Sequence, residues 1–386
     1  MPGALSYLEG RFPSATVTIS SRFSGMTAAV RPPVARRFVS SQIMTIEKMV
    51  SSSVRHGGSE LQRIDYLDGW RGLAILLVLQ GHFLAIQGWH SGRMGVDVFF
   101  CLSGLLMSRI LFQRRVPLVT FYKRRISRII PAFLLYLLIV FAIAALIGKV
   151  APAREVVPTA LFLRSYLPAY PHMFASPYPI GHLWSLNVEE HSYIFLSLLT
   201  LLPFLRGREG GALIGFGLLT IAIHLSYFAF PSIAPPKEYW VRSEVAATNL
   251  LLSAGYSLLR DRTAPYVRPW MPVAAFALGS ALYVGSVFPW MMTMTVAPFF
   301  LAFTVNHLAE APRWVRSALS WKPLRLLGIG SFSIYLWQQP FYQYKKHLFG
   351  SLPSHELLGL VLAVAIGFLS FYAYENRVRS WLNRVW

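Results

Sequence analysis

Charged residues are scarce in this chain of 386 residues: they make up 13% of it, whereas hydrophobic residues make up 55%. A soluble globular domain carries about 25% charged residues, so the deficit indicates that much of the surface faces lipid. Acidic residues are the scarcer kind, with 16 Asp and Glu against 36 Lys and Arg, a formal net charge of +20. In so apolar a chain, this surplus favours basic cytoplasmic loops and sites for anionic ligands over a nucleic-acid partner.

Cysteine is nearly absent. The single Cys101 excludes an internal disulfide framework. No group of His and Cys residues has the spacing of zinc ligands, so we predict no metal site. The chain also lacks a P-loop and a glycine-rich dinucleotide fingerprint. We therefore expect no permanently bound cofactor.

Residues 1–60 differ from the rest of the chain. They are rich in Ser, Arg, Val and Ala and hold no apolar stretch long enough for a signal peptide. We interpret them as a disordered or peripheral N-terminal tail. Met44 is an alternative start to Met1, and the sequence does not decide between the two.

Apolar runs of about 17–25 residues, the length that crosses a bilayer, recur from Trp70 onward. They number ten: 70–87, 95–112, 129–148, 191–205, 212–230, 243–259, 270–288, 290–308, 324–343 and 356–374. We predict an all-α polytopic membrane protein of about ten transmembrane helices, with residues 61–386 forming one transmembrane domain.

The placement of Lys and Arg predicts the orientation, because cytoplasmic loops carry an excess of both. With the N-terminus in the cytoplasm, the inner loops and the C-terminal tail carry 18 of these residues and the outer loops carry 8. Both termini are therefore predicted to be cytoplasmic, which requires an even number of spans.

Five stretches carry a resemblance to a known family. They are LDGWRGLAILLVLQGHF with its Arg-x10-His pair, GVDVFFCLSGLL, FYKRRISRIIPAF, GHLWSLNVEEHSYIF and GSFSIYLWQQP. In this order and spacing, over roughly residues 62–380, they resemble the acyltransferase 3 family of integral-membrane O-acyltransferases. Two positions depart from the family pattern. Gln338 stands where the family commonly has His, which weakens a proton role there without changing the argument for His82. Asn376 follows Glu375, where Glu-x-Pro is usual.

The resemblance implies an enzyme that moves an acyl group from cytoplasmic acyl-CoA to a hydroxyl of a carbohydrate or a related exported acceptor. Acetyl is the default group. It also implies a stand-alone form without the extracytoplasmic hydrolase-like domain of some relatives, in a bacterial cytoplasmic membrane. Direct transfer and transfer through an acyl-enzyme stay open, as do the acceptor, the acyl group and the oligomeric state.

His82 is the expected general base. It lies eleven residues after Arg71, about 16 Å along a helix. With Arg71 at the cytoplasmic surface, His82 would lie near the middle of the roughly 30 Å hydrocarbon core. An imidazole titrates near working pH and can deprotonate a hydroxyl; the alternative is a neutral His that bonds across helices. Arg71 would contact an anion or the thioester carbonyl, or only anchor the helix, and Asp68 could hold it in place.

Arg124, Arg125 and Arg128 follow one another on a predicted inner loop at helical spacing. Arginine matches the geometry of the phosphates of coenzyme A. Basic inner loops are expected in any case, so the charge alone favours topology. The resemblance favours binding of the acyl-CoA donor.

Glu189 and Glu190 are candidates to orient His82 or to bind acceptor hydroxyls; alternatively they complement the dipole of a helix N-terminus. The resemblance favours Glu189. Trp184 either stacks on a sugar or anchors at the interface.

Four further polar residues are candidates for support of the site or acceptor binding. Asp97 and Ser103 begin the second span, where Asp97 either faces the bundle interior or caps the helix. Ser333 and Tyr335 either supply hydroxyls near the reacting centre or form interhelical hydrogen bonds.

Two functions without chemistry remain as alternatives: a transporter or carrier of a glycan or lipid-linked intermediate, and a passive assembly partner. A carrier would use the same intramembrane charges as a pathway. The chain lacks the internal repeat that many transporters show.

Overall fold

The computed structural model describes residues 64–170, 173–235, 238–344, 348 and 355–386. The expected N-terminal tail and the alternative start at Met44 lie outside the described residues. Within the described part, the regular structure is helical, and the extended pairing consists of one antiparallel bridge between Trp89 and Val284. The predicted all-α class is confirmed.

The longer helices, in chain order, are α2 (Asp65–Phe83), α3 (Ser91–Ser108), α4 (Leu118–Leu146), α6 (Trp184–Leu199), α7 (Glu209–Ala229), α9 (Thr248–Thr263), α10 (Trp270–Ala281), α12 (Ala297–Asn306), α14 (Lys322–Gln343) and α16 (His355–Ser370). The shorter ones are α5 (Ala153–Ala160), α8 (Ser243–Ala246), α11 (Met291–Thr295), α13 (Arg313–Leu319) and α17 (Asn376–Val385). Two π-helical turns, η1 (Arg109–Gln113) and η7 (Phe371–Glu375), continue α3 and α16.

Each of the ten predicted ranges falls on one helix or on consecutive helical segments. Within the described residues, four helical stretches are long and apolar enough to cross a membrane by length and composition: Ser91–Gln113, Leu118–Leu146, Glu209–Ala229 and His355–Val385. Two shorter apolar helices are Trp270–Ala281 and Ala297–Asn306. Several apolar helices can thus span a membrane, and the number of ten crossings stays a prediction.

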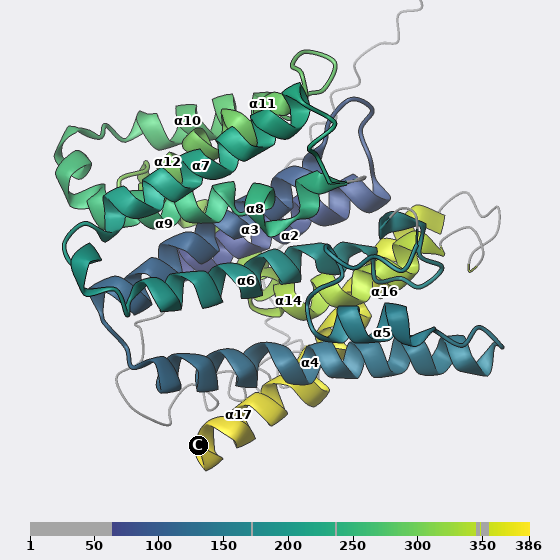
Figure 1. Ribbon diagram of the computed structural model, residues 1–386. Coiled ribbons are helices and arrows are strands. Elements are labelled where there is room, and N and C mark those ends of the chain that lie inside the picture. The colour runs from purple at the N-terminus through teal and green to yellow at the C-terminus, as the bar shows by residue number, and fades with distance from the viewer. Residues whose placement is uncertain (1–63, 171–172, 236–237, 345–347, 349–354) are drawn as a thin grey trace, which may run out of the picture. The chain divides into compact units, whose positions relative to one another are not determined.

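Helix α2 is central to the packing. It packs against both α3 and α14, and α14 in turn packs against α16 (Figure 1). On the other side of α3 lies α9, which also contacts α7 and α12. Because α2 has neighbours on several sides, its buried residues, among them Trp70, Ile75 and Leu79, do not form a single stripe. Such a pattern is typical of a helix enclosed by others.

Glycines allow α2 and α14 to approach closely. A Cβ added at Gly72 of α2 would lie 2.0 Å from the carbonyl oxygen of Leu324, and one at Gly328 of α14 would lie 1.8 Å from that of Asp68. Real side chains do not tolerate such distances, so the two backbones touch here. Small residues serve this purpose in membrane helix pairs, where tight packing takes over from the hydrophobic effect.

The connection from α4 to α6 is fastened by a buried ion pair. Arg164 Nε lies 3.1 Å from Glu155 Oε1, and both side chains are at most 2% exposed. The same guanidinium donates to the carbonyl oxygen of Met173, and Ser176 donates to Glu155. Further along, Tyr136 of α4 donates to the carbonyl oxygen of Pro179. These bonds hold the segment that leads into α6.

We expect Gly328→Ala to lower the apparent melting temperature of the detergent-solubilised protein clearly, because the added methyl group forces α2 and α14 apart. Overpacking of this kind costs about 1–3 kcal/mol or more. Gly215→Ala in α7 is the matched control, since a Cβ there meets nothing within 4 Å. Equal melting temperatures for Gly328→Ala and the wild type would show that the close approach is not required.

Candidate active site

A cavity lies between α2, α3, α4, α6 and α14, and three arginines line it. We call it the arginine cavity. Its lining includes Arg71, Arg125, Arg128, Ser103, Ser185, Glu189, Tyr193 and Tyr335, with Val96, Phe99, Phe100 and Ile129 among its apolar members. The arginines come from two segments, α2 and the start of α4, which are about fifty residues apart in sequence. The fold therefore concentrates positive charge at one place.

Two carboxylates partly balance these arginines. Ser103 Oγ donates to Glu189 Oε1 at 2.5 Å, and Tyr193 donates to Ser103 at 3.2 Å. The guanidinium of Arg125 lies 3.8 Å from Glu190 and 3.7 Å above the ring centre of Tyr193. Such contacts stabilise a charge that is held away from water.

Arg71 lies within this cavity. Its charge is attracted by Asp68 and Glu189, whereas Arg71 and Arg128 repel each other. Because α2 begins at Asp65, Arg71 follows almost two helical turns inside the helix. Arg71 thus lies among the proposed donor-binding arginines. Asp68 is buried on the same helix, three residues before Arg71, as expected of a residue that holds Arg71 in place.

The structure separates Arg124 from its two neighbours. Arg125 and Arg128 line the cavity, whereas Arg124 is exposed and does not. Positions three apart share one side of a helix, but adjacent positions are about 100° apart. Arg124 lies at the edge of the side shared with Arg128, away from Ile129 and the cavity. Donor binding by these arginines stays a prediction.

His82 lies in the last turn of α2, which ends one residue later at Phe83. The predicted span of 70–87 extends beyond this helix end. His82 lies at the end of α2 that is opposite to Asp65, and its depth in the membrane stays a prediction. Its Nδ1 is 2.6 Å from Oε1 of Gln338, and its ring stacks on Tyr342 with centroids 4.3 Å apart.

Glu189 does not hold the Nδ1 of His82. That carboxylate bonds to Ser103 in the arginine cavity, and the Nδ1 partner of His82 is Gln338. The position that departs from the family pattern, Gln338, is therefore in direct contact with His82. Its effect on the role of His82 is not tested by this contact.

A chain of polar groups leads from the arginine cavity toward His82. Tyr335 lines the cavity, and its hydroxyl lies 2.7 Å from Ser185 Oγ and donates to the carbonyl oxygen of His182 at 2.9 Å. The ring of His182 lies 5.2 Å from that of Tyr335, and a positive charge on His82 would disfavour one on His182. His182 is buried, and neither ring nitrogen has a hydrogen-bond partner among the residues that the structure describes. A buried polar group without a partner is costly, and it marks a place where a substrate atom or water fits.

Asp97, Ser333 and Trp184 are among the candidates that lie outside the cavity lining. Asp97 is buried in α3, pairs with Arg93 at 3.0 Å and accepts from Tyr283 at 2.8 Å; it faces the bundle interior and does not cap the helix. Ser333 donates to Glu375 of η7, which is an interhelical bond. One face of the Trp184 ring is covered by the guanidinium of Arg93, which lies 5.0 Å above the ring centre.

Sequence reasoning missed His182, Gln338, Tyr342 and Tyr193. A signal was available for two of them on α14. Ser331, Tyr335, Gln338 and Tyr342 are spaced by four, three and four residues, which places them along one side of a helix. His182 belongs to the GHLWSL stretch, but nothing in the sequence indicates that it lies against Tyr335.

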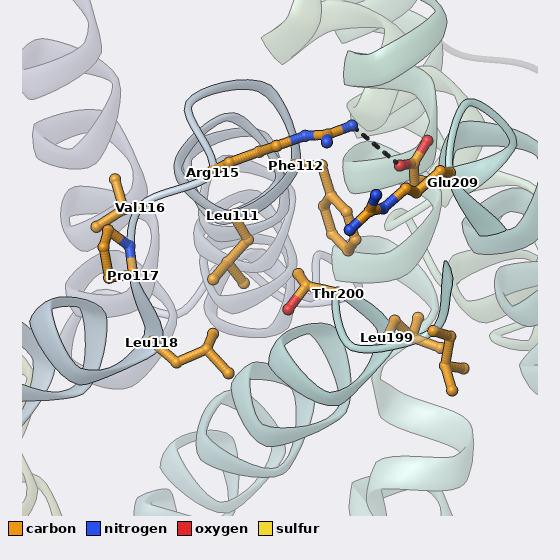
Figure 2. Close-up of a pocket in the computed structure, with 11 residues that line it drawn as sticks. Leu111, Phe112, Arg115, Val116, Pro117, Leu118, Leu199, Thr200 and Glu209 are labelled. Atoms are coloured by element: carbon orange, nitrogen blue, oxygen red, sulfur yellow. Dashed lines mark ion pairs between the residues drawn. The ribbon is translucent and has the colours of Figure 1, made fainter. Parts of the chain in front are cut away.

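A second pocket lies between the end of η1, the start of α4 and the connection from α6 to α7. Figure 2 shows Arg115 and Glu209 pointing toward each other across it, and the two side chains lie 4.0 Å apart. Its remaining lining is largely apolar, with Leu111, Phe112 and Leu199 among its members. None of the candidate catalytic residues lines this pocket, so we place the candidate active site at the arginine cavity and His82.

Residues 64–373 match the family model described as an acyltransferase domain. The chain belongs to the acyltransferase 3 family. The match includes α2, the arginine cavity, His182 and Gln338. Membership does not assign a role to any of these residues.

Curated relatives of this family member include two O-acetyltransferases. Peptidoglycan O-acetyltransferase OatA of Listeria monocytogenes is 27% identical over 354 residues, which cover 81% of this chain and 55% of the relative. O-acetyltransferase OatA of Staphylococcus aureus strain NCTC 8325 is 25% identical over 352 residues, which cover 81% of this chain and 57% of the relative. The chain thus spans little more than half the length of these relatives. No solved structure matches it.

If acetyl-CoA is the donor and binds at the arginine cavity, we expect Arg125→Ala and Arg128→Ala each to raise the KM for it by at least about tenfold. Each substitution would then remove a charge-assisted contact to phosphate worth about 1.5–3 kcal/mol. Arg124→Ala is the matched control on the same helix and should keep the wild-type KM. Kinetics of acetyl transfer in isolated membranes measure this. Equal effects of all three substitutions would indicate a general effect of inner charge.

Proposed function

We propose that this protein is a membrane O-acyltransferase that transfers an acyl group, by default acetyl, from acyl-CoA to a hydroxyl. The observation that carries the proposal is the arginine cavity, whose lining includes Arg71 on the same helix as His82. Family membership and the acetyltransferase relatives support it.

The donor enters at the arginine cavity. The site holds more positive than negative charge: three arginines, Arg71, Arg125 and Arg128, against the two nearby carboxylates of Glu189 and Glu190. A phosphorylated donor would supply the missing negative charge and relieve the repulsion between Arg71 and Arg128. Arg71 and His82 are eleven residues apart, about 16 Å along the helix. The extended pantetheine arm of CoA can bridge such a gap and bring the thioester near His82.

His82 acts as the general base. Its imidazole takes the proton of the acceptor hydroxyl as the oxygen attacks the thioester carbonyl. The C–S bond then breaks, and the CoA sulfur leaves and takes up the proton. Arg71 lies too far along α2 to stabilise the oxyanion of a reaction at His82, so its role is in donor binding.

The acceptor is a carbohydrate hydroxyl. The relative from Listeria is named for peptidoglycan O-acetylation, and a cell-envelope glycan is the corresponding substrate class here. The ring nitrogens of buried His182, which have no hydrogen-bond partner among the described residues, offer a polar contact for it.

The protein lies in a bacterial cytoplasmic membrane and crosses it about ten times, with both termini in the cytoplasm and residues 61–386 as the transmembrane domain. The 18 Lys and Arg of the inner loops and tail support this orientation. Arg125 and Arg128 near the start of α4 agree with it, because they follow an inner loop and face a donor that arrives from the cytoplasm.

His82→Ala should reduce incorporation of labelled acetyl from acetyl-CoA into envelope glycans by at least about 100-fold, the lower range for loss of a general base. His355→Ala at the start of α16 is the matched control and should retain wild-type incorporation. Equal incorporation by His82→Ala and the wild type would rule out the base. Solute flux that survives this substitution and needs no acyl-CoA would favour a carrier.

The orientation is tested with single reporter cysteines, because the only native one, Cys101, is buried and can be replaced by Ala. Arg154 and Arg208 are exposed. A membrane-impermeant maleimide should label Arg154→Cys in intact cells and Arg208→Cys only after the membrane is opened. The reverse labelling would invert the proposed topology.

A further inference from the structure

The second pocket has a charge of its own and lies apart from the proposed chemistry (Figure 2). It encloses about 190 Å³ between two connections that the sequence predicts as inner loops, so we call it the inner-loop pocket. Two arginines, Arg115 and Arg206, line it, and Glu209 is the one acidic residue among its described lining. The surplus of positive charge favours an anionic occupant.

The ion pair across the pocket is a weak one. Arg115 and Glu209 lie 4.0 Å apart, and the arginine side chain is 62% exposed. A long, exposed pair of this kind contributes little to stability. An anion can therefore compete with Glu209 for the guanidinium of Arg115.

The backbone directs Arg115 into the pocket. Its φ of 49° is in the left-handed region, which residues with a Cβ rarely adopt and which persists only where the surroundings fix it. Figure 2 shows the side chain pointing toward Glu209. Pro117 and Leu118 also line the pocket, so the N-terminus of the 29-residue α4 opens onto it and adds the positive end of a helix dipole.

The pocket adjoins exposed apolar side chains. Leu202 lines it and is itself exposed, and Val119 and Phe204, which neighbour lining residues in sequence, are 68% and 71% exposed. Exposed apolar side chains that gather in this way mark contact with a membrane. The volume is also below the roughly 300–1,000 Å³ of sites that enclose a drug-sized ligand. It suits a small charged headgroup whose apolar part lies outside.

We propose that the inner-loop pocket binds the phosphate headgroup of an anionic phospholipid from the cytoplasmic leaflet. The phosphate contacts Arg115 and Arg206, and the acyl chains lie against Leu202 and Phe204. Basic pockets on the cytoplasmic side of membrane helices bind anionic lipids in this way. The proposal goes beyond the proposed function and shares with it only the orientation of the inner loops.

Titration of phosphatidylglycerol into the purified full-length protein in a non-ionic detergent tests the proposal. We expect this lipid to raise the melting temperature and phosphatidylcholine not to do so. Arg115→Ala and Arg206→Ala should each weaken the apparent affinity for phosphatidylglycerol by at least about fivefold, the effect of one basic residue near an anionic lipid. Arg114→Ala and Arg208→Ala are the matched controls, since both residues are exposed and outside the lining. Equal weakening by all four substitutions would overturn the proposal.

Glu209→Gln tests the same site through a gain of binding. It removes the carboxylate that competes for Arg115, so the affinity for phosphatidylglycerol should rise by about twofold or more. A purely structural ion pair would not give this result. If an arginine variant fails to fold, Glu209→Gln decides, and an unchanged or lower affinity would contradict the proposal.

Two soluble phosphates distinguish the source of the anion. Glycerol 3-phosphate carries the phosphate without acyl chains, and protection by it equal to that by phosphatidylglycerol would overturn a lipid site. A raised KM for acetyl-CoA in both Arg115→Ala and Arg206→Ala would assign the pocket to the donor instead. His82→Ala should bind phosphatidylglycerol as the wild type does, so this proposal and the proposed function fail separately.

Discussion

The direct contact between the backbones of α2 and α14 is the constraint on which the site depends. Gly72 and Gly328 allow it, because a side chain at either position would collide with a carbonyl oxygen of the other helix. The resulting alignment brings Tyr335 to the cavity that contains Arg71, and Gln338 to His82. Any shift of α14 along α2 would change both ends of the site together.

Charge burial sets the second constraint. Arg71, Arg125 and Arg128 would be costly in a membrane helix bundle if each were alone. The carboxylates of Glu189 and Glu190 and the ring of Tyr193 reduce that cost without cancelling the positive charge. A cavity with this residual charge favours an anionic donor, and the neutral polar groups that continue toward His82 suit an acceptor hydroxyl.

Much of the fold and part of the site could be predicted. Long apolar runs predicted the helices, since the length and composition of a run are local properties. The Arg-x10-His pair and the pair Arg125 and Arg128 were recognisable from spacing. The partners of His82 were not: Glu189 was expected beside it and lies with Ser103 instead, because the rotation of α6 about its axis depends on packing against α3.

The sequence by itself determined the all-α class, the family resemblance and the identity of the polar residues inside apolar runs, because hydropathy and motif spacing are written along the chain. Only the tertiary structure decided that Arg124 lies outside the cavity, that His82 ends its helix, and that Gln338 contacts His82. These facts depend on the register and rotation of helices far apart in sequence. Close backbone packing sets both, and no local pattern encodes it.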